Sequence, residues 1–419
     1  METTTKEQFD QLLTAMVGRD AGISDLLFVT GNPPQTEVHG ELKSFALESI
    51  GALLTSPRIE GFAKIIINNN PRLVQDLTDQ GSCDCSYSLP ASHRFRVNIY
   101  RQNGNHAMVL RRLQSQIPSM ESLQLPPVFR QIIKEKTGLI FVTGGTGSGK
   151  TTTLAAMLNE INQTSEVHVV TLEDPIEFLH PRIKSTFSQR EMGRDFFNFP
   201  DGLRAALRQA PKVIFVGEIR DRESLEIALT AGETGHVVYS TLHTINAGQT
   251  INRILAMFGK DEEQQVRARL TGSLRYIVSQ RLVPQISGGR LLVTELMGSS
   301  MRSREVIELG ENEKRRLGDI IEAGQTAGWH SFDQSLLKAY EDNLITEEMA
   351  LLHCTSKSQL SQRLDTVNKQ RATEQTASTL KMKEEKRTYK PLPPSPPKLT
   401  VVQPDGSAPL PDNVCITKP

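Results

Sequence analysis

The sequence has little cysteine and no excess of charge of either sign. Its four cysteines are Cys83, Cys85, Cys354 and Cys415, and none belongs to a C-x-x-C pair. This spacing argues against a zinc site or a disulfide framework. Lys and Arg together number 48, as do Asp and Glu, so the formal net charge is zero. Without a basic surplus, we expect no nucleic-acid partner.

Long apolar stretches and a signal-peptide pattern are also missing. A membrane-spanning helix needs roughly 18 or more consecutive apolar residues, and no such run occurs. We therefore expect a soluble, cytoplasmic protein whose contact with any membrane comes through a partner. The length of 419 residues suggests about two or three domains, each large enough to bury its own core.

The patterning divides the chain into five segments. Residues 1–115 mix short strands and helices, which predicts a small α+β domain, and prolines mark a linker at residues 116–127. Strands alternate with helices over residues 128–297, which predicts an α/β domain with a largely parallel sheet. Residues 298–365 have apolar side chains at helical spacing and predict a helical region. Residues 366–419 are polar, charged and finally proline-rich, and predict a disordered tail.

The tail carries overlapping P-x-x-P patterns in residues 391–397. Such a segment is too poor in apolar residues to fold alone. It acts either as a tether or as a polyproline II ligand that binds a protein partner, and the sequence leaves both interpretations open.

A glycine-rich sequence follows a predicted buried strand. Residues 144–151 read GGTGSGKT and match G-x-x-x-x-G-K-[ST] at every fixed position. Glycine lets the backbone curl around phosphates, so that amide N–H groups and the next helix terminus face the anion. Lys150 would contact the β- and γ-phosphates, and the Thr151 hydroxyl would bind Mg²⁺. The predicted nucleotide-binding residues are Gly144, Gly145, Thr146, Gly147, Ser148, Gly149, Lys150, Thr151 and Thr152.

Carboxylates and histidines flank three further predicted strands. Glu173 lies in TLEDPIE and Glu218 in VIFVGEIRD, each directly after a buried strand. Ligands of parallel sheets bind at this carboxyl edge. We predict that Glu173 polarises water or holds Mg²⁺, and that Glu218 aligns the attacking water. His243 follows a third strand and is a candidate γ-phosphate contact, while His236 precedes the same strand and is a weaker one.

Four motifs in this order resemble those of the PilT-like retraction ATPases of type IV pili, within the type II/IV secretion ATPase superfamily. They are the Walker A loop GGTGSGKTT, the Asp box TLEDPIEF, the Walker B sequence VIFVGEIRD with a glutamate, and the His box ETGHVVYSTLHT. The resemblance covers about residues 20–365. It implies an N-terminal PAS-like α+β domain, a RecA-like P-loop ATPase domain, a C-terminal helical region and assembly into a homohexamer.

The resemblance also implies an activity and partners. ATP hydrolysis would drive pilin depolymerisation and twitching motility through an inner-membrane pilus platform protein, with the motor at the cytoplasmic face of the inner membrane at the pilus base. Arginines delivered by domain closure would stabilise phosphate charge. By this match, the candidate phosphate contacts are Arg96, either Arg111 or Arg112, Arg204 and Arg208.

Two features separate the branches of this superfamily. The chain lacks the four-cysteine metal module that is usual in extension and type II secretion ATPases, which favours the retraction branch. Residues 297–305 read MGSSMRSRE, in place of the Ala-Ile-Arg helix motif of retraction ATPases. Three alternatives therefore stay open: an accessory paralogue that partners another pilus ATPase, a protein or DNA secretion ATPase, and, more distantly, a small-molecule kinase.

Overall fold

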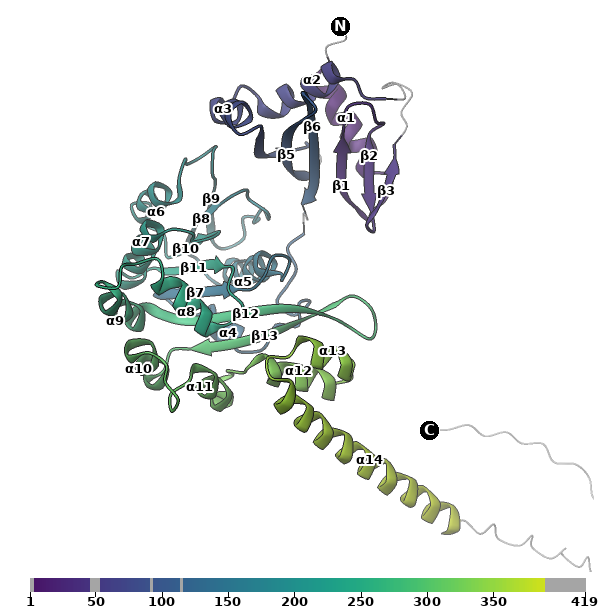
Figure 1. Ribbon diagram of the computed structural model, residues 1–419, viewed down its shortest axis with the longest axis vertical. Coiled ribbons are helices and arrows are strands. Elements are labelled where there is room, and N and C mark those ends of the chain that lie inside the picture. The colour runs from purple at the N-terminus through teal and green to yellow at the C-terminus, as the bar shows by residue number, and fades with distance from the viewer. Residues whose placement is uncertain (1–3, 46–52, 91–92, 114–115, 389–419) are drawn as a thin grey trace, which may run out of the picture. The chain divides into compact units, whose positions relative to one another are not determined.

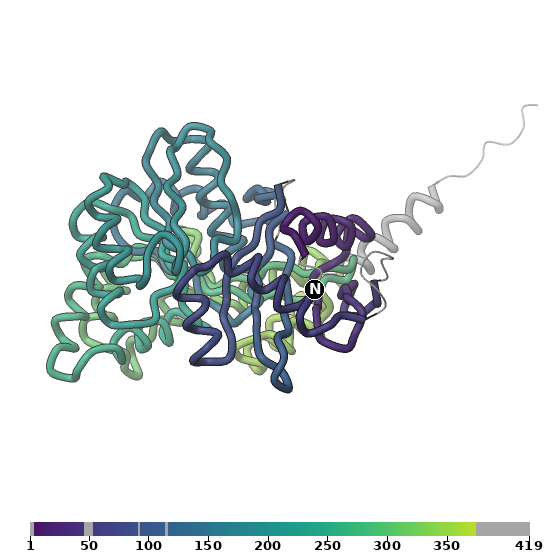
Figure 2. Tube along the Cα trace, turned by 90° about the horizontal axis from the view of Figure 1, so that it is seen from above, coloured from purple at the N-terminus to yellow at the C-terminus, as the bar shows by residue number. Residues whose placement is uncertain are grey.

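The computed structural model describes residues 4–45, 53–90, 93–113 and 116–388 (Figure 1). The chain divides into two units, Met1–Gln362 and Arg363–Pro419, and both β-sheets belong to the first. In Figure 1 the purple-to-blue segment forms one body and the teal and green segment forms another, whereas in the turned view of Figure 2 the two traces overlap. Among the described residues, no helix is long and apolar enough to cross a membrane.

The N-terminal domain contains an antiparallel sheet with the strand order β3-β2-β1-β6-β5-β4. Strand β5 buries every second side chain in the core of this domain, namely Phe95, Val97 and Ile99. Phe9 of α1 stacks on Phe62 of α2 in the same core, with ring centroids 4.7 Å apart. The predicted α+β domain is confirmed. Its elements are α1 Lys6–Val17, β1 Ile23–Phe28, β2 Gln35–Val38, β3 Glu41–Ser44, α2 Ser56–Ile67, α3 Pro71–Asp79, β4 Ser82–Ser88, β5 Arg94–Gln102 and β6 Asn105–Leu113.

The parallel-sheet domain contains the second sheet, with the order β13-β12-β7-β11-β10-β8-β9. Its strands run parallel except β13, which forms an antiparallel hairpin with β12. Every residue of β7 is buried, as expected for a central strand covered on both faces. The predicted parallel sheet is confirmed. The strands are β7 Gly138–Thr143, β8 His168–Glu173, β9 Thr186–Glu191, β10 Val213–Val216, β11 Val237–Leu242, β12 Leu274–Pro284 and β13 Arg290–Gly298.

Helices cover both faces of this sheet. Leu139 and Phe141 of β7 pack in one hydrophobic core with α7, α8 and α9, whereas Ile140 and Val142 pack in the other with α4 and α5. This alternation follows from the two-residue period of a strand. The covering helices are α4 Phe129–Ile132, α5 Lys150–Thr164, α6 Phe199–Leu207, α7 Arg222–Glu233, α8 Ala247–Leu255 and α9 Glu263–Ser273.

Short helices follow the second sheet, as the sequence predicts. Asp333 connects two of them, because its carboxylate accepts hydrogen bonds from the backbone N–H groups of Thr355 and Ser356 at 2.6 and 2.9 Å. These bonds satisfy amides that precede the last helix. The elements are α10 Met301–Leu309, α11 Leu317–Ala323, the 3₁₀ turn Gln325–Ala327, α12 Phe332–Glu341, α13 Glu347–His353 and α14 Lys357–Thr388.

Helix α14 continues beyond the predicted start of the disordered tail at residue 366. Its first turns bury Leu360 and Leu364 completely. The following residues contain many Lys, Glu, Gln and Ala, which favour helix without needing a packed apolar face. The helix therefore extends to Thr388, past the predicted start of the tail, while the domain boundaries stay a prediction. The P-x-x-P patterns of residues 391–397 lie outside the described residues.

Removing residues 366–419 is expected to shift the thermal unfolding midpoint of the remaining chain by less than about 2 °C, because Leu360 and Leu364 stay in place. Differential scanning calorimetry of the full chain and the truncated chain measures the shift. A second truncation after Thr355, which removes both leucines, is the destabilised comparison. Equal losses from the two truncations would contradict the expectation.

Candidate functional site

The phosphate loop, residues 144–151, joins β7 to α5 in a conformation that requires glycine. Gly144, Gly147 and Gly149 have φ angles of 148°, 76° and 87°. A Cβ at Gly144 would lie 2.6 Å from the backbone oxygen of Gln280 in β12, which is closer than real contacts allow. Gly149 is the N-cap of α5, so the loop leads directly into a helix N-terminus, where amides and the helix dipole favour an anion.

The side chains of this loop suit phosphate. Lys150 is buried, and its Nζ donates hydrogen bonds to the carbonyl oxygens of Gly144 and Gly145 at 2.9 and 3.1 Å. Burial lowers the pKa of Lys150, and the carboxylates of Glu218 and Glu177 act in the opposite direction. The Ser148 hydroxyl is buried without a hydrogen-bond partner among the described residues. A bound phosphate would give these groups oxygen acceptors, so the residues fit the predicted nucleotide.

Glu173 ends β8 and points into a network of hydrogen bonds. Its Oε1 accepts from the Thr171 hydroxyl at 2.6 Å and from the Gln189 amide at 3.3 Å. Burial raises the pKa of Glu173 from its usual value of 4.5 to about 7. Glu173 also lines one cavity with Lys150 and Thr151. Its predicted role as a metal ligand stays a prediction.

Glu177 is a second candidate for that role, although the sequence analysis did not select it. It lies in the acidic loop, residues 174–180 after β8, and lines the same cavity as Thr151, whose hydroxyl acts to lower the pKa of this carboxyl. Lys150 and Arg96 are close enough to lower its pKa, which burial raises overall. A threonine hydroxyl beside a carboxylate is a ligand set that fits Mg²⁺. The signal in the sequence was the second glutamate of TLEDPIE, four residues after Glu173.

Glu218 and His243 lie at the same sheet edge as the phosphate loop. Glu218 follows β10 and His243 follows β11, and the parallel register aligns these strands with each other and with β7. The Oε2 atom of Glu218 lies 3.5 Å from Nε2 of His243 and 2.8 Å from a guanidinium nitrogen of Arg220. The structure thus brings both predicted residues next to Lys150, and it adds Arg220.

His236 lies at the opposite end of β11. Its neighbour Val237 pairs with Gly138, the first residue of β7, whereas the phosphate loop follows the last. Nδ1 of His236 is 3.2 Å from the carbonyl oxygen of Ala231. A strand of six residues spans about 20 Å, so the structure does not bring His236 to the phosphate loop of its own chain.

A cavity of about 560 Å³ separates the phosphate loop from the N-terminal domain. Arg96 of β5 lines this cavity together with Lys150. Arg72 of α3 lines it too, although the sequence analysis did not select this residue. Arg112 does not line it, because its guanidinium instead donates to the carbonyl oxygen of Ala21 at 3.4 Å. Arg111 pairs with Asp25 at 2.9 Å, so Arg96 is the predicted N-terminal arginine that faces the loop.

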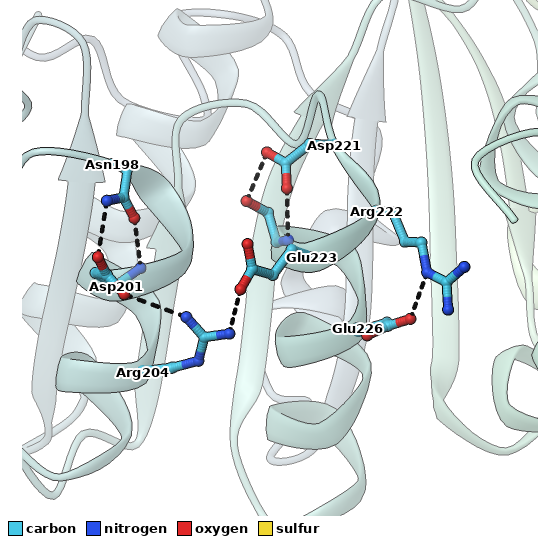
Figure 3. Close-up of polar contacts among 8 residues, drawn as sticks. Asn198, Asp201, Arg204, Asp221, Arg222, Glu223 and Glu226 are labelled. Carbon is cyan, nitrogen blue, oxygen red and sulfur yellow. Dashed lines mark hydrogen bonds and ion pairs between the residues drawn. The ribbon is translucent and has the colours of Figure 1, made fainter.

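Arg204 and Arg208 occupy a surface outside this cavity. Arg204 of α6 forms ion pairs with Asp201, at 3.2 Å, and with Glu223 of α7 (Figure 3). Arg208 follows the last turn of α6 and is exposed. Neither side chain lines the cavity beside the phosphate loop of its own chain.

Comparisons with known proteins agree with this geometry. Residues 88–349 match the family described as "Type II/IV secretion system protein". The type IV pilus retraction ATPase PilT of Pseudomonas aeruginosa is 38% identical over 78% of this chain and 93% of its own. The type IV pilus ATPase PilU of the same organism is 36% identical over 84% and 91%. A crystal structure of the pilus retraction motor PilT with bound ADP has a TM-score of 0.75 and 38% identity, covering 84% of this chain and 98% of that one.

We expect Glu173→Gln to be more stable than the wild type, by a difference in unfolding midpoint that grows from about pH 5 to pH 8. The folded state holds the Glu173 proton more tightly than the unfolded state, because burial raises the pKa to about 7. Wild-type stability therefore falls as pH rises through this window, by at most on the order of 3 kcal/mol. The amide does not titrate and keeps an oxygen for Thr171. Unfolding midpoints measured across this pH range provide the test.

Glu348→Gln, an exposed change on α13, is the matched control and should track the wild type at every pH. A constant difference between Glu173→Gln and the wild type from pH 5 to pH 8 would show that Glu173 does not titrate there.

Proposed function

We propose that this chain, which belongs to the type II/IV secretion ATPase family, is an ATP-hydrolysing motor that retracts type IV pili. Its similarity to the retraction ATPase PilT over most of both chains supports the assignment. ADP in the related PilT structure supports an adenine nucleotide as the ligand. The output of such a motor is pilin depolymerisation and twitching motility.

The observation that carries the proposal is the convergence of four functional groups at one sheet edge. Lys150, the Thr151–Glu177 pair, Glu218 and His243 all lie at the carboxyl ends of β7, β8, β10 and β11. A buried cation, a metal-ligand pair and a carboxylate for water are the parts that phosphoryl transfer to water requires.

Each side chain has a distinct task in hydrolysis. Lys150 binds the β- and γ-phosphates. Thr151 and Glu177 would hold Mg²⁺, which would supply positive charge for the phosphate oxygens. Glu218 aligns the attacking water and accepts its proton. His243 lies 3.5 Å from Glu218 and orients that carboxylate while contacting the γ-phosphate.

Motion between domains turns this chemistry into work. Arg96 and Arg72 face the phosphate loop across the cavity, so nucleotide phosphates attract the N-terminal domain toward the loop. The nucleotide drives closure because it binds the closed arrangement more tightly than the open one. In a homohexamer, the outward-facing Arg204 and Arg208 contact the neighbouring subunit. The ring acts on an inner-membrane pilus platform protein at the cytoplasmic face of that membrane.

Purified Lys150→Ala and Glu218→Gln proteins are expected to fail at different steps. Lys150→Ala loses a phosphate contact, so it binds fluorescent ADP and ATP weakly and does not turn over. Glu218→Gln keeps the phosphate contacts, so it binds ATP with near-normal affinity but releases phosphate about 10²-fold or more slowly. Glu348→Gln should match the wild type in both assays. Normal phosphate release by either site variant would refute the assignment.

In cells, Glu218→Gln is expected to produce excess surface pili and to abolish twitching motility, because stalled retraction leaves assembled filaments in place. Electron microscopy of pili and a surface-motility assay give the readout, with Glu348→Gln as control. Bald cells would indicate an extension motor instead. Unchanged pili and motility would indicate a secretion ATPase or an accessory role.

One alternative has specific support. PilU is nearly as similar to this chain as PilT, and α10 begins with Met301 and Arg302 in place of the Ala-Ile-Arg motif. An accessory ATPase that assists a paralogous motor fits both observations. It predicts that Glu218→Gln leaves motility intact while a variant unable to form hexamers does not.

A further inference from the structure

Glu191 is a buried carboxylate outside the four motifs. It is the last residue of β9 and only 7% exposed. Its Oε1 accepts a hydrogen bond from the Ser86 hydroxyl of β4 at 2.5 Å, and a guanidinium nitrogen of Arg94 in β5 lies 3.8 Å from its Oε2. Because β4 and β5 belong to the N-terminal sheet, this carboxylate connects the two domains.

The same carboxylate supports the acidic loop. Its Oε2 accepts a hydrogen bond from the backbone N–H of Ile176 at 3.2 Å. Ile176 directly precedes Glu177, whose side chain lines the same cavity as Thr151. A continuous series of contacts therefore runs from Ser86 in the N-terminal domain through Glu191 to the proposed Mg²⁺ ligands.

The charges around Glu191 make this contact sensitive to domain position. The Arg94 side chain is 13% exposed, and its Nη1 has no hydrogen-bond acceptor among the described residues. Burial lowers the pKa of Arg94. The negative charge of Glu191 acts most strongly in the opposite direction. Removing one partner of a buried ion pair leaves the other charge uncompensated. Displacement of the N-terminal domain would therefore change the surroundings of both groups at once.

Gln189, two residues earlier on β9, provides a contrast. Its amide holds the acidic loop through the carbonyl oxygen of Phe178 and the backbone N–H of His180. These contacts lie within the parallel-sheet domain. Glu191 combines loop support with a contact to the N-terminal domain.

We propose that Glu191 is a positioning residue that transmits the placement of the N-terminal domain to Glu177. With that domain in contact, Ser86 and Arg94 hold the carboxylate, the carboxylate holds the Ile176 amide, and Glu177 stays beside Thr151. When the domain moves away, Glu191 loses both N-terminal partners and the acidic loop loosens. The inference rests on the proposed ATPase function for its consequence, but not for the contacts themselves.

Ser86→Ala tests the transmission, because the Ser86 hydroxyl donates to Glu191 and, among the described residues, makes no hydrogen bond to the acidic loop. Hydrogen–deuterium exchange of full-length protein should show amide exchange in residues 174–178 faster by about threefold or more, as expected for coupled contacts in one network. Ser88→Ala is the matched control, since Ser88 is exposed and lies on the same face of β4. Unchanged exchange in Ser86→Ala would overturn the proposal.

Catalysis gives the second readout. Glu191→Ala should raise the Mg²⁺ concentration needed for half-maximal ATP hydrolysis by about ten- to a hundredfold, as is usual when support for metal ligands is lost. Ser86→Ala should shift it in the same direction by less, and Ser88→Ala not at all. If Glu191→Ala has an effect and Ser86→Ala has none, Glu191 supports the acidic loop independently of the N-terminal domain. That result would overturn the proposed coupling. Failure of the wild type to hydrolyse ATP would refute the proposed function, while the exchange experiment would still test the coupling.

Discussion

The parallel hydrogen-bonded register of β7, β11, β10 and β8 is the constraint on which the site depends. Each strand is short and buried, and each ends in a loop that carries one functional group. Since parallel strands end at the same edge, residues more than 60 positions apart in the chain, such as Lys150 and Glu218, become neighbours. The helices on both faces keep that edge rigid by burying the alternate apolar residues of β7.

Burial then sets the chemistry of the individual groups. Lys150 and Glu173 both lie in poorly solvated surroundings, which lowers the pKa of the amine and raises that of the carboxyl. The carboxylates of Glu177 and Glu218 counter this effect on Lys150 and favour its charged form. Two glutamates four residues apart therefore have different surroundings: Glu173, at the end of β8, accepts a hydrogen bond from Thr171, and Glu177 lies near Thr151.

The N-terminal domain faces the nucleotide site at two places. The N-terminal domain presents Arg96 to the phosphate loop across a cavity, and it presents Ser86 and Arg94 to Glu191 at the rim of the same sheet. The first contact depends on a ligand to bridge it, whereas the second is direct. A nucleotide that draws the domains together would therefore act on contacts that already support the acidic loop.

The amino-acid pattern alone predicts the phosphate loop, the buried strands and the family, because glycine spacing and unbroken apolar runs are local and leave the backbone few choices. Which flanking side chains meet follows from the folded arrangement. Folding places Glu177 in the same cavity as Thr151, and His236 at the opposite end of β11 from the phosphate loop. It also directs Arg112 to the carbonyl oxygen of Ala21 and Glu191 to Ser86. Such pairings join segments far apart in the chain, so they follow from packing between domains and strands rather than from any local pattern.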